Sequence, residues 1–169
     1  MVHMGRPRGF SEEAVLEAAA SVFIHGGYEA TSIDDLVKAL NLHRGSLYKA
    51  FGSKRGLFLA VLRHYIETQL ANASSAAFAP QGTLDSSLPE HLDLDLLLIA
   101  ALEGGHRDAE VAALVRRALG LIELATADPA DVPRSSAAPA PCPVRAIELL
   151  GARLYSRLHP DPDDPNVPH

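Results

Sequence analysis

Apolar residues recur along this chain at the three- and four-residue spacing of one helix face, in segments separated by short breaks. This period is typical of amphipathic helices, whereas a half-buried strand would alternate every second residue. The sequence shows no convincing strand pattern and no internal repeat. It therefore predicts an all-α fold. The longest apolar stripe consists of Leu57, Phe58, Val61, Leu62, Tyr65, Ile66 and Leu70.

Composition narrows the possible classes of protein. The chain has 169 residues and a net charge of −6, and 47% of its residues are hydrophobic, which is ordinary for a protein with a buried core. A single cysteine excludes an intrachain disulfide framework and favours a reducing compartment. No apolar run reaches the roughly 20 residues of a membrane-spanning helix, and residues 1–13 lack the apolar stretch of a secretion signal. We therefore expect a cytoplasmic protein without membrane contact.

The first third of the chain predicts short helices with well-defined ends. Ser11 is suited to cap the first helix, and Gly26–Gly27 ends it because glycine readily adopts the left-handed conformation. Either Thr31 or Ser32 caps a second helix, since each is followed three residues later by an aspartate that completes a capping box. Asn41 then suits the positive φ of a tight turn between helices.

The helix after this turn, at about residues 43–50, carries polar side chains and only Leu47 as an inward-facing residue. Two short helices joined by a tight turn form a helix-turn-helix, in which the second helix enters the major groove of DNA. Gly45 is a poor helix former, which favours close approach to another molecule over helix stability. We expect base or phosphate contacts from His43, Arg44, Ser46, Tyr48 and Lys49.

Residues on either side of this helix are further candidates for DNA contact. Lys54 stands at the start of the fourth helix, where a cation opposes the helix dipole unless an anion such as a phosphate is nearby. Thr31 and Ser32 can offer hydroxyl and backbone N–H groups to phosphate. Arg6 and Arg8 lie in a basic arm suited to the minor groove. Residues 1–65 have a small positive net charge and the rest is acidic, so only the N-terminal part is expected to bind a polyanion.

Residues 10–65 resemble the DNA-binding domain of TetR/AcrR-family transcriptional regulators. The resemblance is carried by Gly27–Tyr28, Thr31, Leu47–Tyr48 with Phe51, and Ser53–Lys54 with Leu57, while Asn41 replaces the usual turn glycine. It implies a homodimer that binds a palindromic double-stranded DNA operator. It further implies repression of transcription and release from the operator by a small-molecule effector.

The resemblance also implies a helical C-terminal domain for dimerisation and effector binding. Helices are expected at about 92–103, 109–125 and 144–158, which is fewer than in typical members of the family. An effector pocket would then be small, completed by the partner chain, or absent. We expect the helices at 109–125 and 144–158 to form the dimer interface as a four-helix bundle. The predicted organisation is a basic arm (1–9), a three-helix helix-turn-helix DNA-binding domain (10–56), a small helical dimerisation and effector domain (57–159) and a disordered tail (160–169).

Other functions are weakly supported by the sequence. It contains no nucleophile elbow, phosphate-binding loop, dinucleotide-binding glycine motif or HExxH, so we expect neither an enzyme nor a cofactor. His91, Asp93 and Asp95 have metal-ligand chemistry, but acidic residues at a helix start explain the aspartates, and we expect no metal. Cys142 lies between two prolines and lacks the cationic surroundings of a redox thiol. A protein-interaction module that kept the helix-turn-helix but lost DNA binding is the alternative.

Overall fold

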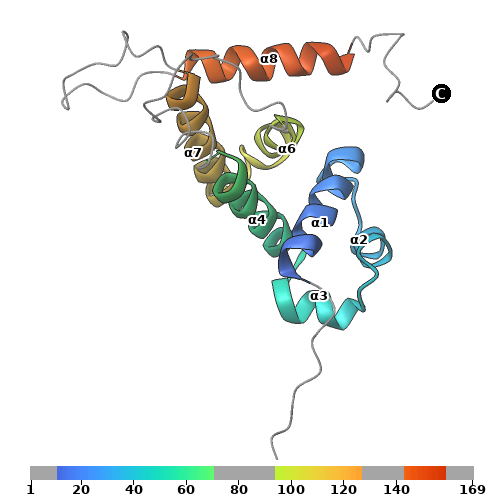
Figure 1. Ribbon diagram of the computed structural model, residues 1–169. Helices are drawn as coiled ribbons and strands as arrows, with labels where there is room; N and C mark the ends of the chain where they lie inside the picture. The colour runs from blue at the N-terminus through green and yellow to red at the C-terminus, as the bar shows by residue number, and fades with distance from the viewer. Residues whose placement is uncertain (1–10, 71–93, 127–142, 159–169) are drawn as a thin grey trace, which may run out of the picture. The chain divides into compact units, whose positions relative to one another are not determined.

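The computed structural model describes residues 11–70, 94–126 and 143–158, and all regular structure among them is helical (Figure 1). The expected all-α fold is therefore confirmed. The chain divides into two compact units, Met1–His64 and Tyr65–His169. The predicted domain boundary at residue 56 stays a prediction. Among the described residues, no helix has the length and hydropathy needed to cross a membrane.

The N-terminal unit contains α1 (Glu12–Gly26), α2 (Ile33–Leu40), α3 (Arg44–Phe51) and most of α4 (Lys54–Tyr65). The ends of these helices follow from local sequence. Ser11 accepts a hydrogen bond from the N–H of Ala14 at 3.1 Å, and Gly27 ends α1 with a φ of 77°. Both features confirm the expected first helix.

The core of the N-terminal unit contains aromatic side chains from α1 and α4. The ring of Phe23 is fully buried and meets that of Phe58 edge-on, with 5.0 Å between ring centroids. Tyr28, in the loop after α1, adds its ring at 4.6 Å from Phe58. Leu36 of α2 and Leu47 of α3 are also fully buried. The aromatic rings hold α1 and α4 together, and the buried leucines attach α2 and α3 to this core.

The C-terminal unit starts with a π-helical turn, η1 (Ile66–Leu70), that continues α4. The expected apolar stripe from residue 57 to residue 70 is buried throughout. It runs through this change of helix type, which the sequence pattern does not reveal. Residues 71–93 and 127–142 lie outside the described part, and so do residues 159–169, which include the expected tail.

The rest of the C-terminal unit contains α6 (Leu94–Ile99), a π-helical turn η2 (Ala100–Gly104), α7 (Ala109–Thr126) and α8 (Val144–Leu158). Asp108 accepts a hydrogen bond from the N–H of Glu110 at 3.0 Å, as expected for the cap of α7. Helix α8 packs against α6 and α7 (Figure 1). The three helices expected in this half are therefore present, and the first of them ends in a π-helical turn.

An ion pair joins α6 to α8. The Arg153 guanidinium donates from Nε to Oδ1 and from Nη2 to Oδ2 of Asp95, at 2.8 Å each. Asp95 is 6% exposed, and a buried carboxylate needs such a partner to offset its desolvation. The expectation that Asp95 only complements a helix start is incomplete, because its carboxylate is held by a distant arginine. His91 and Asp93 lie outside the described residues.

Candidate nucleic-acid interface

The turn between α2 and α3 has the geometry expected of a helix-turn-helix. Asn41 adopts the left-handed conformation, with φ 49° and ψ 41°. The N–H of Leu42 donates to the carbonyl of Val37 at 3.2 Å, which satisfies one of the last carbonyls of α2. Asparagine is among the few residues other than glycine that tolerate this conformation. The predicted turn is therefore confirmed at the expected residue.

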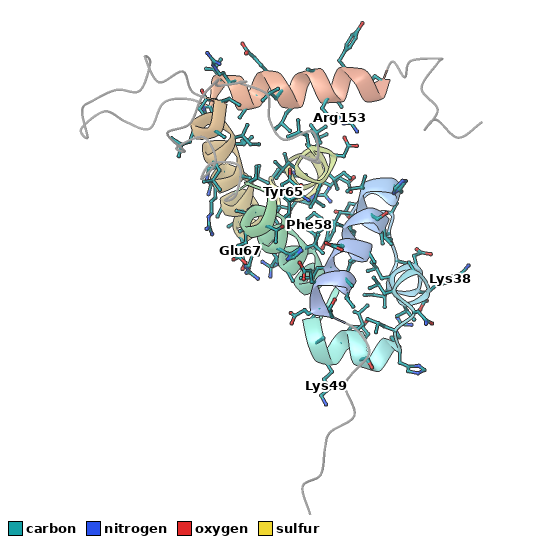
Figure 2. All side chains as sticks on the ribbon, viewed as in Figure 1. Lys38, Lys49, Phe58, Tyr65, Glu67 and Arg153 are labelled. Carbon is teal, nitrogen blue, oxygen red and sulfur yellow. The ribbon has the colours of Figure 1, made fainter. Side chains whose placement is uncertain are left out.

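Helix α3 buries Leu47, has Phe51 half-buried at its end and exposes its other side chains. Leu47 is fully buried, whereas Tyr48 is 42% exposed and Lys49 is exposed. Figure 2 shows Lys49 pointing away from α1 and α2. An alanine-type Cβ built on Gly45 would meet nothing within 4 Å, so packing inside the protein does not require a glycine there. The exposed residues of this surface, which we call the α3 surface, are His43, Arg44, Gly45, Ser46, Tyr48 and Lys49.

One residue of the α3 surface has a partner that the sequence pattern does not indicate. The Nη1 of Arg44 lies 3.0 Å from Oδ1 of Asp34 on α2. Both side chains are largely exposed, at 57% and 77%, and exposed ion pairs contribute little free energy. Arg44 can therefore exchange Asp34 for a phosphate or a guanine at small cost.

The two hydroxyl residues before α2 differ in burial and in hydrogen-bond partners. Thr31 is 4% exposed, and its hydroxyl donates to the carbonyl of Gly27 at 2.6 Å. Ser32 is the N-cap, and its hydroxyl donates to Oδ2 of Asp35 at 2.6 Å while accepting from the N–H of Asp35 at 3.1 Å. Of the two possible capping boxes, the one at Ser32 forms. Both hydroxyl protons are used within the protein, and the predicted phosphate contacts of Thr31 and Ser32 stay predictions.

The capping box makes the stability of α2 depend on pH. The hydroxyl and the N–H of Ser32 both donate to the Asp35 carboxylate, and these bonds hold the pKa of Asp35 below its ordinary value. Because the pKa is lower in the folded state, the ionised carboxylate adds stability above the unfolded pKa, and this stability is lost as pH falls through the folded pKa. We expect Asp35→Asn to lower Tm at neutral pH, and we expect this loss of Tm to shrink as pH falls below the ordinary aspartate pKa of about 3.9. Thermal unfolding of both proteins from neutral to acidic pH measures this difference in Tm.

Asp34→Asn is the matched control, because Asp34 stands in the same first turn and lacks the bonds to Ser32. A Tm difference between the wild type and Asp35→Asn that does not change with pH would contradict the assignment.

Lys54 stands at the start of α4 as expected, but its ammonium group contacts partners within the protein that the sequence does not indicate. It is half-buried at the start of α4, and its Nζ donates to the carbonyls of Tyr28 at 2.8 Å and Thr31 at 3.0 Å. A third contact, to the carbonyl of Glu29, is 3.4 Å long. The positive charge near the helix start is thus balanced by carbonyl oxygens, so a phosphate is not needed to explain it. Arg6 and Arg8 lie outside the described residues.

Comparison with known proteins identifies the fold and the N-terminal unit. Residues 15–61, which include α2, the turn and α3, match the family model of the bacterial regulatory proteins of the tetR family. The match covers less than a third of the chain and shows that its N-terminal unit is similar to the DNA-binding part of tetR-family regulators. The proteins that the family model describes are bacterial regulators of transcription.

Curated relatives are similar to this chain mainly over its N-terminal half. The HTH-type transcriptional repressor ComR of Escherichia coli K12 is 39% identical over 87 residues, which are 52% of this chain and 41% of that protein. The HTH-type transcriptional repressor BdcR of the same organism is 43% identical over 65 residues, or 38% of this chain and 33% of that protein. The chain thus matches about two fifths or less of these relatives' lengths.

A solved structure extends the likeness of fold to most of the chain. The TetR family transcriptional regulator PfmR from Thermus thermophilus superimposes with a TM-score of 0.54 at 20% identity. The match covers 90% of this chain and 88% of that one. It shows that the helical C-terminal part also follows the TetR fold, as the sequence predicts.

Acidic and histidine side chains gather at a second place in the N-terminal unit. Glu13, Glu17 and His64 each bring one possible ligand atom within 4.8 Å of the others. Glu13 and Glu17 are one helical turn apart and exposed, which the sequence alone indicates, whereas the approach of His64 depends on the packing of α4. Exposed groups of this kind are common without a metal, and we describe them as a charged surface cluster.

Proposed function

We propose that this chain is a sequence-specific DNA-binding transcriptional regulator of the TetR family. The α3 surface carries the proposal, because Leu47 is fully buried and the neighbouring polar side chains of the helix are exposed. Arginine, lysine, tyrosine and serine are the side chains that bind base edges and phosphates. The match of residues 15–61 to the family model supports the same assignment.

Selection of bound duplexes from a random DNA pool tests this proposal. The purified protein is used at ~150 mM salt, where non-specific binding is weak. We expect enrichment of a palindrome, because a two-fold symmetric dimer places one α3 surface on each half-site. Absence of any enriched sequence, with a protein that circular dichroism shows to be folded, would contradict the proposal.

We further propose that the active form is a homodimer formed by α7 and α8. Helix α8 turns Ala146 and Arg153 toward α6 and α7. Its opposite side carries an exposed apolar stripe that consists of Val144, Ile147, Leu154, Tyr155 and Leu158. In this stripe Ile147 is 51% exposed and Leu158 is 68% exposed, although the sequence pattern favours burial of both. On α7, Leu124 is 43% exposed. Apolar surface of this kind on two packed helices is typical of a helical dimer interface.

Charged residues in this stripe are expected to produce monomers. The double variant Ile147→Glu and Leu154→Glu places two carboxylates where the proposed partner helix would pack, and light scattering should show the mass fall from two chains to one. Ala152→Glu adds the same charge at an exposed position on another face of α8 and should stay dimeric. A dimer that persists in the double variant would exclude α8 from the interface.

As a regulator, the protein is proposed to repress transcription and to leave its operator when a small molecule binds the C-terminal unit. The resemblance to the family supports this role, and so do the names of the relatives ComR and BdcR as repressors. The effector can be sought through the rise in Tm that a bound ligand causes by mass action. Compounds that raise Tm are then tested for release of the selected duplex.

A further inference from the structure

Lys54 connects the start of α4 to the loop between α1 and α2, which we call the α1–α2 loop (residues 27–32). Its Nζ contacts three carbonyl oxygens of this loop, those of Tyr28 at 2.8 Å, Thr31 at 3.0 Å and Glu29 at 3.4 Å. A lysine ammonium carries three N–H groups, so each of them has an acceptor. The same nitrogen lies 4.5 Å from the centroid of the Tyr28 ring.

The α1–α2 loop is held from several sides. Tyr28 inserts its ring against Phe58 and Phe23, at centroid distances of 4.6 and 6.0 Å. The Thr31 hydroxyl closes the loop by donating to the carbonyl of Gly27. Lys54 satisfies three further carbonyls of the loop. Since Ser32 is the N-cap of α2, the position of this loop determines where α2 begins.

We infer that Lys54 is a positioning residue that fixes the α1–α2 loop, and through α2 the α3 surface, instead of a residue that binds phosphate. Carbonyl oxygens that lose a half-buried donor must be rehydrated or stay unsatisfied, which costs free energy. A phosphate would have to compete with three oxygens already in place around Nζ. The role in DNA recognition rests on the proposed function, whereas the role in fixing the loop does not.

The inference predicts specific properties for Lys54→Met, which keeps the length of the side chain and removes the charge. We expect Tm to fall by several degrees and the amides of residues 28–32 to exchange faster with deuterium. Affinity for the selected operator should fall at least tenfold at a temperature where the variant is folded. Affinity for unrelated DNA and the log–log salt slope should stay unchanged, because no phosphate contact is lost.

Matched variants separate positioning from phosphate binding. Lys54→Arg should not restore operator affinity, because the planar guanidinium cannot direct its N–H groups at three converging carbonyls. Lys49→Met, on the α3 surface, should instead reduce the salt slope by about 1.8, since each protomer of the proposed dimer loses one phosphate contact, without changing Tm. Lys38→Met removes an exposed lysine of α2 and should change neither property (Figure 2).

Two results would overturn the inference. One is a Lys54→Met protein with the Tm and loop exchange of the wild type. The other is a salt slope reduced by about two in Lys54→Met, one unit for each protomer of the dimer, together with full affinity in Lys54→Arg, which is the behaviour of a phosphate contact. If the wild type selects no DNA sequence, the proposed function fails, and Tm and loop exchange still test whether Lys54 fixes the loop.

Discussion

Gly56→Ala is expected to destabilise the N-terminal unit by about 3 kcal/mol, the upper part of the usual range of about 1–3 kcal/mol for overpacking, because the new methyl group would overlap backbone atoms. A Cβ at this position in α4 would lie 1.9 Å from the carbonyl oxygen of Phe51 and 3.1 Å from its carbon. Both atoms belong to the backbone at the end of α3, so no side-chain rotation relieves the overlap. The end of α3 has to move away from α4.

Denaturant unfolding of the variant measures this effect, and Gly45→Ala is the matched control. Gly45 lies in α3 with nothing within 4 Å of a built Cβ. Alanine there should stabilise the helix by about 0.5–1 kcal/mol, because it lowers the entropy lost on folding. A Gly56→Ala protein as stable as the wild type would show that α3 and α4 are not in such close contact.

Replacing both Tyr48 and Lys49 by alanine is expected to abolish operator binding. Both side chains lie on the α3 surface and neither is buried, so the fold should keep its Tm within a few degrees. Contacts of this type are worth about 1–3 kcal/mol each, and the loss of two predicts at least about thirtyfold weaker binding. Fluorescence anisotropy with the selected duplex at ~150 mM salt measures it.

The double alanine variant also serves to separate DNA binding from assembly. Light scattering should show the same mass as the wild type, because the proposed dimer interface lies on α7 and α8. Lys38→Ala, which removes an exposed lysine from α2, is the control for loss of charge. Operator binding that survives in the double variant at moderate salt would exclude the α3 surface as the recognition element.

Most helix ends could be predicted from the sequence because they depend on neighbouring residues. A serine cap, a left-handed glycine or asparagine and an apolar stripe all act within about one helical turn. Ser11, Gly27 and Asn41 therefore end or begin helices where expected. Helix α8 also has its expected bounds, Val144–Leu158.

Features that depend on distant residues could not be predicted in the same way. Lys54 contacts carbonyls 23 to 26 residues away, and Arg153 pairs with Asp95 across 58 residues. A lysine near a helix start suggests a phosphate ligand, because the positive charge opposes the helix dipole. The carbonyl oxygens that balance the charge of Lys54 come from a distant segment and cannot be identified from the sequence. Nothing in the sequence singles out Gly56, since only the packing of α4 against the end of α3 shows why a side chain has no room there.

The sequence by itself determined that this protein is helical, where its N-terminal helices begin and end, and that a short, mostly polar helix follows the turn at Asn41. These properties arise from backbone conformation and contacts within one turn. Only the tertiary structure decided which polar groups are already used inside the protein, as at Thr31 and Lys54, and which apolar residues stay exposed, as along α8. Those outcomes depend on which atoms packing brings together, and an apolar stripe looks the same in the sequence whether it faces its own core or a second chain.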